Sequence, residues 1–217
     1  MPIRTTFYID GFNFYHGLRS ARKDISPHWK QYYWLDLVAF ANQFLTPAHE
    51  LVKVKYFTAS PLDPGKEVRQ SALFKANKFI NNDKIEFIKG KYYQKSIRCG
   101  STCRNNFIIH EEKRTDVNIS VEIMGDCAFD KTDLIVLISA DSDLVPPIEY
   151  VLKNFPKKRV KVFFPPCRKS TDLMSILKKN GERVIFLDSN ELKFKKSIMP
   201  HHVDIGGSIA DIPPSWI

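Results

Sequence analysis

The residues best suited to chemistry in this sequence are aspartates that follow predicted strands. Asp10 comes directly after the apolar segment 5–9, and Asp141 and Asp143 follow the apolar run 133–139. Asp116 lies at the start of a predicted helix. In parallel sheets, ligands bind beyond the carboxyl ends of the strands, where the strand order changes direction. We therefore expect these carboxylates to share one site at the carboxyl ends of the strands, which we call the carboxyl edge of the sheet.

Electrostatic repulsion decides what such a cluster needs. Two carboxylates about 4–5 Å apart repel by about 3–4 kcal/mol at an effective dielectric of about 20. Three such pairs approach the whole stability of a domain, which is about 5–15 kcal/mol. The cluster must therefore bind a cation, share protons or spread apart. Ligands that are all oxygen favour Mg²⁺ or Mn²⁺ over zinc, and such ions engage phosphates and activate water.

Helix capping is the alternative role for the same residues. An aspartate after a strand often accepts hydrogen bonds from the first turn of the next helix. Asp10 is placed to cap a turn that starts at Gly11, and Asp143 precedes a predicted helix that begins with Pro146 and Pro147. For any single aspartate, capping is as plausible as metal binding. The convergence of three segments favours a shared acidic site.

The elements that position these residues alternate along the chain. The apolar pattern predicts strands over 5–9, 51–58, 133–139, 159–164 and 183–187. It predicts helices over 33–45, 65–80, 115–128, 146–154 and 171–179. Extended segments at 85–93 and 106–110 flank a polar tip and predict a β-hairpin. The alternation predicts an α/β fold of three layers, with a mostly parallel central sheet and an inserted β-hairpin.

Two local details accompany these predictions. Thr115 is the expected N-cap of the helix over 115–128. The expected inward stripe of the helix over 65–80 consists of Val68, Ala72, Lys75, Ala76 and Phe79.

We expect residues 1–194 to form one domain. Residues 195–217 show no periodicity and contain paired glycines and paired prolines, so we expect an extended C-terminal tail.

Composition excludes several classes of protein. Hydrophobic residues make up 43% of the 217 residues and charged residues 26%, which is typical of a globular protein. No apolar run approaches the about 18 residues of a membrane span, and Asp10 interrupts the region where a signal peptide would be apolar. We expect a cytoplasmic protein with no membrane partner. Phosphate-loop, dinucleotide-binding and serine-hydrolase motifs are absent from the sequence.

The net charge of +9 is concentrated in one stretch. Residues 151–200 contain 13 basic and 4 acidic side chains. A local basic excess attracts RNA or DNA, although solvated lysine-rich helix faces give the same composition. The candidates for contact with a nucleic-acid backbone in this stretch are Lys157, Lys158 and Arg159.

A second kind of metal site has weaker support. Cys99 and Cys103 form a C-x3-C pair, and His110 lies seven residues further on. Structural zinc is normally held by four ligands. The sequence offers no full set of four here, so structural zinc at Cys99 and Cys103 is a minor alternative.

Three motifs, taken together and in order, resemble those of NYN domains, a LabA-like branch of the PIN-like nuclease superfamily. They are YIDGFNF at 8–14, EEKRTDVNIS at 111–120 and ISADSDLVP at 138–146. The resemblance implies a PIN-like fold with a central acidic pocket and a metal-dependent ribonuclease activity. The chain departs from many relatives at Arg114 and Thr115, where they carry Gly-Val or a similar pair.

The resemblance also implies roles for individual residues. It assigns the acidic positions, which would hold Mg²⁺ or Mn²⁺, to Asp10, Asp116, Asp141 and Asp143. It places Asn13 in the pocket beside the first aspartate as a further catalytic residue. The residues expected to contact substrate are Lys113, Ser139, Ser142, Lys157, Lys158 and Arg159. Four further carboxylates either extend the site or are surface charges: Glu111, Glu112, Glu122 and Asp126.

The leading hypothesis is a metal-dependent endoribonuclease whose partner is RNA. A non-catalytic RNA-binding module that retains the pocket is one alternative. A metal-dependent phosphatase or nucleotidase is another, because the same metal chemistry acts on small phosphate esters. The hairpin expected at 85–110 offers a surface for a homodimer.

Overall fold

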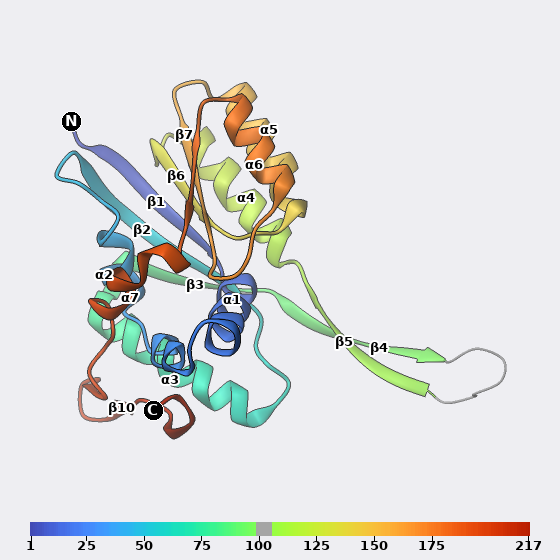
Figure 1. Cartoon of the computed structure of the whole chain (residues 1–217), viewed down its shortest axis with the longest axis vertical. Helices are drawn as coiled ribbons and strands as arrows, with labels where there is room; N and C mark the ends of the chain where they lie inside the picture. The colour runs from blue at the N-terminus through green and yellow to red at the C-terminus, as the bar shows by residue number, and fades with distance from the viewer. Residues whose placement is uncertain (99–105) are drawn as a thin grey trace.

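A six-stranded parallel sheet forms the centre of the molecule (Figure 1). The computed structural model describes the backbone of residues 1–98 and 106–217, and the side chains of residues 1–91 and 114–217. The strand order is β3-β2-β1-β6-β7-β8. The strands are β1 (Ile3–Asp10), β2 (His49–Thr58), β3 (Ile85–Lys89), β6 (Leu134–Ile138), β7 (Arg159–Phe164) and β8 (Arg183–Phe186). The expected α/β fold is therefore confirmed.

Helices cover both faces of this sheet, as three layers require. They are α1 (Gly11–Asp24), α2 (Leu37–Asn42), α3 (Pro64–Asn81), α4 (Thr115–Ala128), α5 (Val145–Asn154), α6 (Thr171–Lys179) and α7 (Glu191–Lys195). Successive side chains of β1 point to opposite faces. Phe7 and Ile9 pack in the core under α1 and α2, whereas Tyr8 packs in the core under α4, α5 and α6.

The sheet has its switch point at β1. This strand pairs with β2 on one side and with β6 on the other, and both pairings are parallel. The chain thus builds outward in two directions from β1. In such sheets, the crevice beyond the carboxyl ends of the two central strands is the usual ligand site.

The inserted hairpin is also confirmed. Strands β4 (Lys91–Arg98) and β5 (Asn106–Lys113) pair antiparallel between β3 and α4. Their ribbon extends away from the body of the molecule (Figure 1). Its tip, which includes Cys99 and Cys103, lies outside the described residues.

The first helix, α1, was not among the predicted helices, although Asp10 was placed to cap a turn starting at Gly11. Phe14, Leu18 and Ala21 form its buried stripe at helical spacing, but Gly11 and Gly17 lower the helix propensity of this segment. The helix predicted over 33–45 was wrong at its start. Residues Pro27–Tyr33 form a 3-10 helix, and α2 begins only after Asp36, whose carboxylate caps it.

Two further details were wrong. Val68, Lys75 and Phe79 of the expected stripe on α3 are exposed. Ala76 is buried as expected, and the neighbouring Asn77 is buried as well. Asn77 can be buried because its side-chain amide is hydrogen-bonded. It accepts the backbone N–H of Leu37 and donates to the carbonyl of Leu35. Thr115 is the first residue of α4 rather than its cap.

Residues 195–217 differ from the extended tail that was expected. Strands β9 (His202–Asp204) and β10 (Ile209–Asp211) form a small antiparallel hairpin. Trp216 is buried, with its ring 5.7 Å from that of Tyr33 and 6.3 Å from that of Trp34. Burial of a few apolar side chains thus orders a segment that shows no periodicity.

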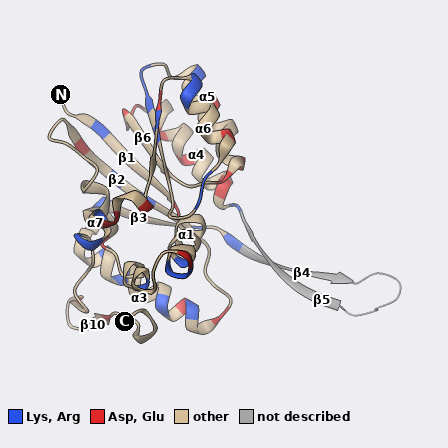
Figure 2. Cartoon of the chain, viewed as in Figure 1, with Lys and Arg blue, Asp and Glu red and all other residues tan. Residues whose placement is uncertain are grey.

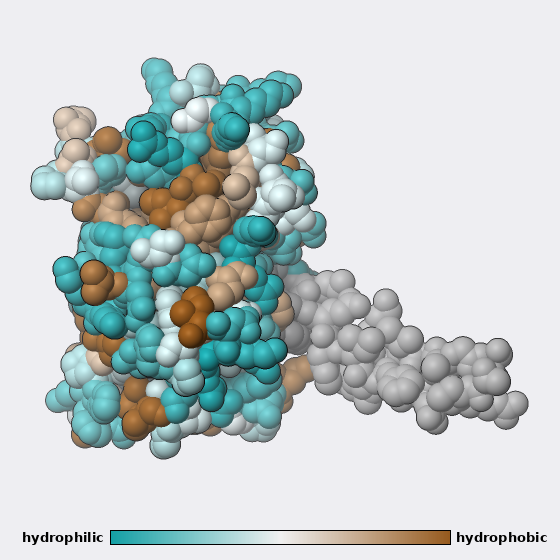
Figure 3. Space-filling view, in the orientation of Figure 1, coloured by the Kyte–Doolittle hydropathy of each residue, from teal (hydrophilic) through white to brown (hydrophobic). Residues whose placement is uncertain are grey.

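Neither charged nor hydrophobic residues gather in one region of the face in view. Figure 2 shows Lys and Arg distributed over several elements of the face in view. On the same face, hydrophobic residues form separate patches among hydrophilic ones (Figure 3). Within the described part of the chain, no helix has both the length and the apolar character needed to cross a membrane.

Candidate metal centre

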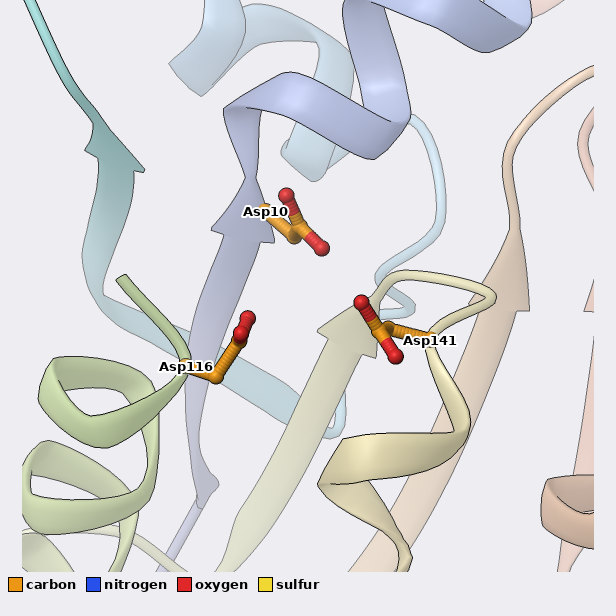
Figure 4. Close-up of side chains that lie close together, drawn as sticks. All are labelled: Asp10, Asp116 and Asp141. Atoms are coloured by element: carbon orange, nitrogen blue, oxygen red, sulfur yellow. The ribbon is translucent and has the colours of Figure 1, made fainter. Parts of the chain in front are cut away.

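Three of the predicted aspartates meet at the switch point. Asp10 ends β1, Asp141 follows β6, and Asp116 lies in the first turn of α4. Each offers a carboxylate oxygen, and the three oxygens all lie within 4.8 Å of one another. Figure 4 shows the three side chains directed toward a common space from these separate elements. The shared acidic site expected from the sequence is therefore present.

Asp10 is held by three hydrogen bonds to its carboxylate. Its side chain is buried and accepts the backbone N–H of Asn13 at 3.0 Å, which caps α1. Its second oxygen accepts the side-chain amide of Asn13 at 2.9 Å and the hydroxyl of Ser139 at 2.8 Å. Capping and membership of the acidic cluster are thus compatible roles of one residue.

Ser139 links two members of the cluster. Its hydroxyl donates to Asp10 and accepts the backbone N–H of Asp141 at 3.0 Å. The residue is completely buried. It was expected to contact substrate, but its burial and these two bonds give it a positioning role. Asn13 likewise acts on Asp10 in this structure, since its amide donates to that carboxylate.

The chain enters α4 through an unusual backbone conformation. Arg114 precedes the helix with a φ of 76°, a left-handed conformation that favours glycine. The strained residue directs the chain from β5 into α4 and so helps to place Asp116 beside the sheet edge.

Burial and charge act together on this site. Burial raises the pKa of Asp10 above its usual value, the hydrogen bonds from Asn13 and Ser139 oppose that rise, and the charge of Asp141 adds to it. At 4.8 Å, two carboxylates repel by about 3 kcal/mol at an effective dielectric of about 20. A bound divalent cation removes this repulsion, and a set of carboxylate oxygens suits a hard cation. The residues present therefore fit a hard divalent metal ion.

Asp143 and Ser142 do not join the cluster. Both are exposed, and the part that Asp143 plays is to donate its backbone N–H to Asp141 at 3.0 Å. Asp143 does not cap α5 either, since no side chain caps that helix. The turn after β6 directs only its first aspartate toward β1, because Asp141 begins a short 3-10 helix that turns the next residues outward.

The expected basic contacts lie elsewhere. Lys157, Lys158 and Arg159 precede or begin β7, so they lie at the amino edge of the sheet, opposite the aspartates. Lys158 is occupied there by ion pairs with Asp130 and Asp133. The side chains of Lys113, Glu111 and Glu112 lie outside the described residues.

Glu122 and Asp126 belong to a different network. They accept hydrogen bonds from Lys55 of β2, at 2.6 Å and 2.5 Å. Asp126 is buried and also accepts the hydroxyl of Tyr8 at 2.7 Å. The network holds α4 against the sheet and does not extend the acidic site. The sequence signal for it was a lysine within the apolar strand β2.

Residues 4–188 match the NYN domain. The chain belongs to the NYN domain family. This is a nuclease-like family, and the match covers the sheet, the aspartates and the inserted hairpin.

Two known proteins are similar to this NYN chain. One is 6-hydroxy-3-succinoylpyridine 3-monooxygenase HspA of Pseudomonas putida, with 26% identity over 183 residues. That alignment covers 69% of this chain and 56% of the relative, so the chain spans little more than half of the relative's length. The other is the crystal structure of a protein of unknown function, VPA0982, from Vibrio parahaemolyticus. It has 19% identity and a TM-score of 0.53, and the match covers 87% of this chain and 95% of that one.

Proposed function

We propose that this protein is a metal-dependent endoribonuclease that hydrolyses RNA phosphodiester bonds. One observation carries the proposal: the carboxylates of Asp10, Asp116 and Asp141 converge within 4.8 Å at the switch point of an NYN domain. Mg²⁺ or Mn²⁺ is the proposed cofactor. RNA is the proposed partner.

The residues divide the chemistry between them. When bound by Asp10, Asp116 and Asp141, Mg²⁺ or Mn²⁺ would lower the pKa of a bound water and neutralise charge on the phosphate. Ser139 and Asn13 hold the carboxylate of Asp10 in one orientation. A fixed orientation matters because preorganised charges need no rearrangement during the reaction.

The metal ligands that this chain offers can be compared with the activity named for the Pseudomonas relative. Non-haem iron oxygenases bind their metal with two histidines and one carboxylate. The cluster found in the described part of this chain consists of three aspartates. Hydrolysis at a hard cation agrees better with these ligands than iron-dependent oxygenation does.

Cleavage assays test the proposal. A labelled single-stranded oligoribonucleotide is incubated with the protein and Mg²⁺, Mn²⁺ or EDTA. We expect cleavage with either metal and none with EDTA. Asp10→Asn and Asp141→Asn should each lower the rate by about 100-fold or more, because each removes a carboxylate that would hold the cation stabilising the transition state. Asp172→Asn is the matched control, since Asp172 is exposed in the first turn of α6.

Three outcomes would contradict the proposal. Cleavage by Asp10→Asn at the wild-type rate would remove the acidic site from the reaction. RNA binding without cleavage in either metal would support the non-catalytic module. Turnover of nucleoside monophosphates in preference to the oligoribonucleotide would support the phosphatase.

A further inference from the structure

A cavity of about 520 Å³ lies at the same edge of the sheet as the metal centre, over the opposite face. Its walls come from α1, from the end of β2 and the segment after it, from α3 and from Trp216. Sites for small molecules commonly measure about 300–1,000 Å³. The cavity is therefore large enough for one ring system with a substituent.

Aromatic side chains form much of the wall. They are Phe12, Tyr15, Tyr56, Phe74 and Trp216. Phe12 is 49% exposed although it belongs to the first turn of α1, and its ring lies 4.3 Å from the ring of His16. Planar rings stack on such surfaces, and stacking of a nucleobase on an aromatic side chain contributes about 1–3 kcal/mol.

Two cations lie in the same wall. Lys66 and Arg69 belong to the first half of α3 and line the cavity. Within the described part of the chain, neither forms an ion pair. Asp63 also lines the cavity, but its carboxylate caps α3 by accepting the backbone N–H of Lys66 at 2.7 Å. The cavity therefore pairs flat apolar walls with an unneutralised positive charge.

His16 adds a neutral ring to this wall. Burial lowers its pKa below the usual value, and the charges of Arg168, Arg19 and Lys66 lower it further. The imidazole is thus uncharged at neutral pH and offers a face for stacking. The same three cations show that positive charge gathers around this end of α1.

The cavity and the metal centre meet at the junction of β1 and α1. Asp10 directs its carboxylate to the α4 face, and the next residue, Gly11, lines the cavity. A side chain on Gly11 would place its Cβ 2.4 Å from the ring of Tyr56 and 2.6 Å from the carbonyl oxygen of Phe57. Glycine therefore lets α1 start directly against β2, so the cavity begins one residue after a metal ligand.

We propose that this cavity binds the base of a nucleotide whose chain runs across the sheet edge to the three aspartates. The base stacks between the aromatic walls, and Lys66 and Arg69 contact the adjoining phosphate. A base that enters a cavity cannot remain paired, so the substrate is single-stranded. The inference rests on the proposed nuclease function and adds the class of substrate to it.

Binding measured without catalysis tests the cavity. The protein is titrated calorimetrically, in EDTA, with the four ribonucleoside 5′-monophosphates, with the matching nucleosides and with inorganic phosphate. We expect the monophosphates to bind best. Phe12→Ala should weaken their binding by about 5-fold or more. Arg69→Gln should weaken the binding of monophosphates but leave that of nucleosides nearly unchanged.

Matched variants control for general effects of charge and of aromatic area. Phe129→Ala removes an exposed aromatic residue at the far end of α4, and Lys75→Gln removes an exposed charge from α3 outside the cavity. Neither should change nucleotide binding. A thermal melt of Phe12→Ala checks its fold, and Arg69→Gln provides a second, independent variant.

The results separate this inference from the proposed function. Binding of phosphate as tight as that of the nucleotides, or equal weakening by Phe129→Ala and Phe12→Ala, would overturn the cavity proposal. A protein that cleaves RNA but binds no nucleotide in EDTA would overturn it while leaving the nuclease intact. A protein that binds nucleotides in the expected order but cleaves no RNA would keep the cavity and remove the nuclease.

Discussion

At the scale of single residues, Ser139 is the most informative. Its hydroxyl joins the carboxylate of Asp10 to the backbone of Asp141 while being completely buried. Partners of metal-binding residues typically change metal affinity or activity by about 10–100-fold when they are removed. We therefore expect Ser139→Ala to weaken Mn²⁺ binding by a factor in that range. Calorimetric titration with Mn²⁺ measures the change.

The neighbouring serine supplies the control. Ser142 is exposed in the turn that follows Asp141, so Ser142→Ala should leave the Mn²⁺ affinity unchanged. The free energy of unfolding of Ser139→Ala should fall by about 1–3 kcal/mol, as for the loss of a buried hydrogen-bonding group. Equal Mn²⁺ affinities in the two variants would show that Ser139 does not position the site.

At the scale of elements, the position of α4 depends on a buried charge. Lys55 is 7% exposed and bonds to Glu122 and Asp126 of α4. Burial would lower the pKa of Lys55, but the hydrogen bonds from Lys55 to Asp126 and Glu122 outweigh it and raise the pKa. Removing one partner of a buried ion pair leaves a charge without compensation and costs about 3–5 kcal/mol. We expect Lys55→Met to lower the free energy of unfolding by about that amount in urea denaturation.

Two variants make that prediction specific. Lys53→Met changes a half-exposed lysine of the same strand and should alter the free energy of unfolding far less. Adding Asp126→Asn to Lys55→Met removes the uncompensated charge and should restore part of the loss. A single variant Lys55→Met as stable as Lys53→Met would show that the network does not hold α4.

Some elements could be predicted from the sequence alone and others could not. Strands such as β6 were predictable because buried β-branched runs have few alternatives, and their ends located Asp10 and Asp141. The helix α1 was hard to predict because it begins with a glycine, which has a low helix propensity. The reason for glycine at position 11 is its close contact with Tyr56 and Phe57 of β2, and the local sequence does not show this contact. The cavity beside it could not be predicted for the same reason: its walls come together only in the folded sheet.

The site residues also differ in how well the sequence predicts their positions. The three aspartates at element ends were predicted from order and spacing, and the structure brings them together. Asp143 lies only two residues beyond Asp141, yet a short 3-10 turn directs it outward. A shift of this kind depends on local backbone geometry, which neither composition nor motif order reports.

At the scale of the whole molecule, the two edges of the sheet have different charge environments. At the amino edge, Arg4 and Lys158 pair with Asp130 and Asp133. The hydrogen bond from Arg4 holds the pKa of Asp133 well below its usual value. At the carboxyl edge, Lys66 lines the cavity, and the charge of Arg168 reaches His16 in its wall. The basic excess of residues 151–200 is thus partly neutralised on the edge remote from the aspartates.

This asymmetry predicts which cations contact RNA. Each phosphate contact with a single strand contributes about 0.7 to the slope of log affinity against log salt concentration. Replacing both Lys66 and Arg168 by glutamine should therefore lower that slope by about 1.4 and weaken binding of a single-stranded oligoribonucleotide. The pair Lys157→Gln and Arg159→Gln removes the same charge from the amino edge and should leave the slope unchanged. Fluorescence anisotropy at several salt concentrations, in EDTA, measures both. Equal slopes in the two double variants would mean that RNA responds to the net charge of the molecule, and a loss confined to the amino-edge pair would place the RNA path on the opposite edge from the aspartates.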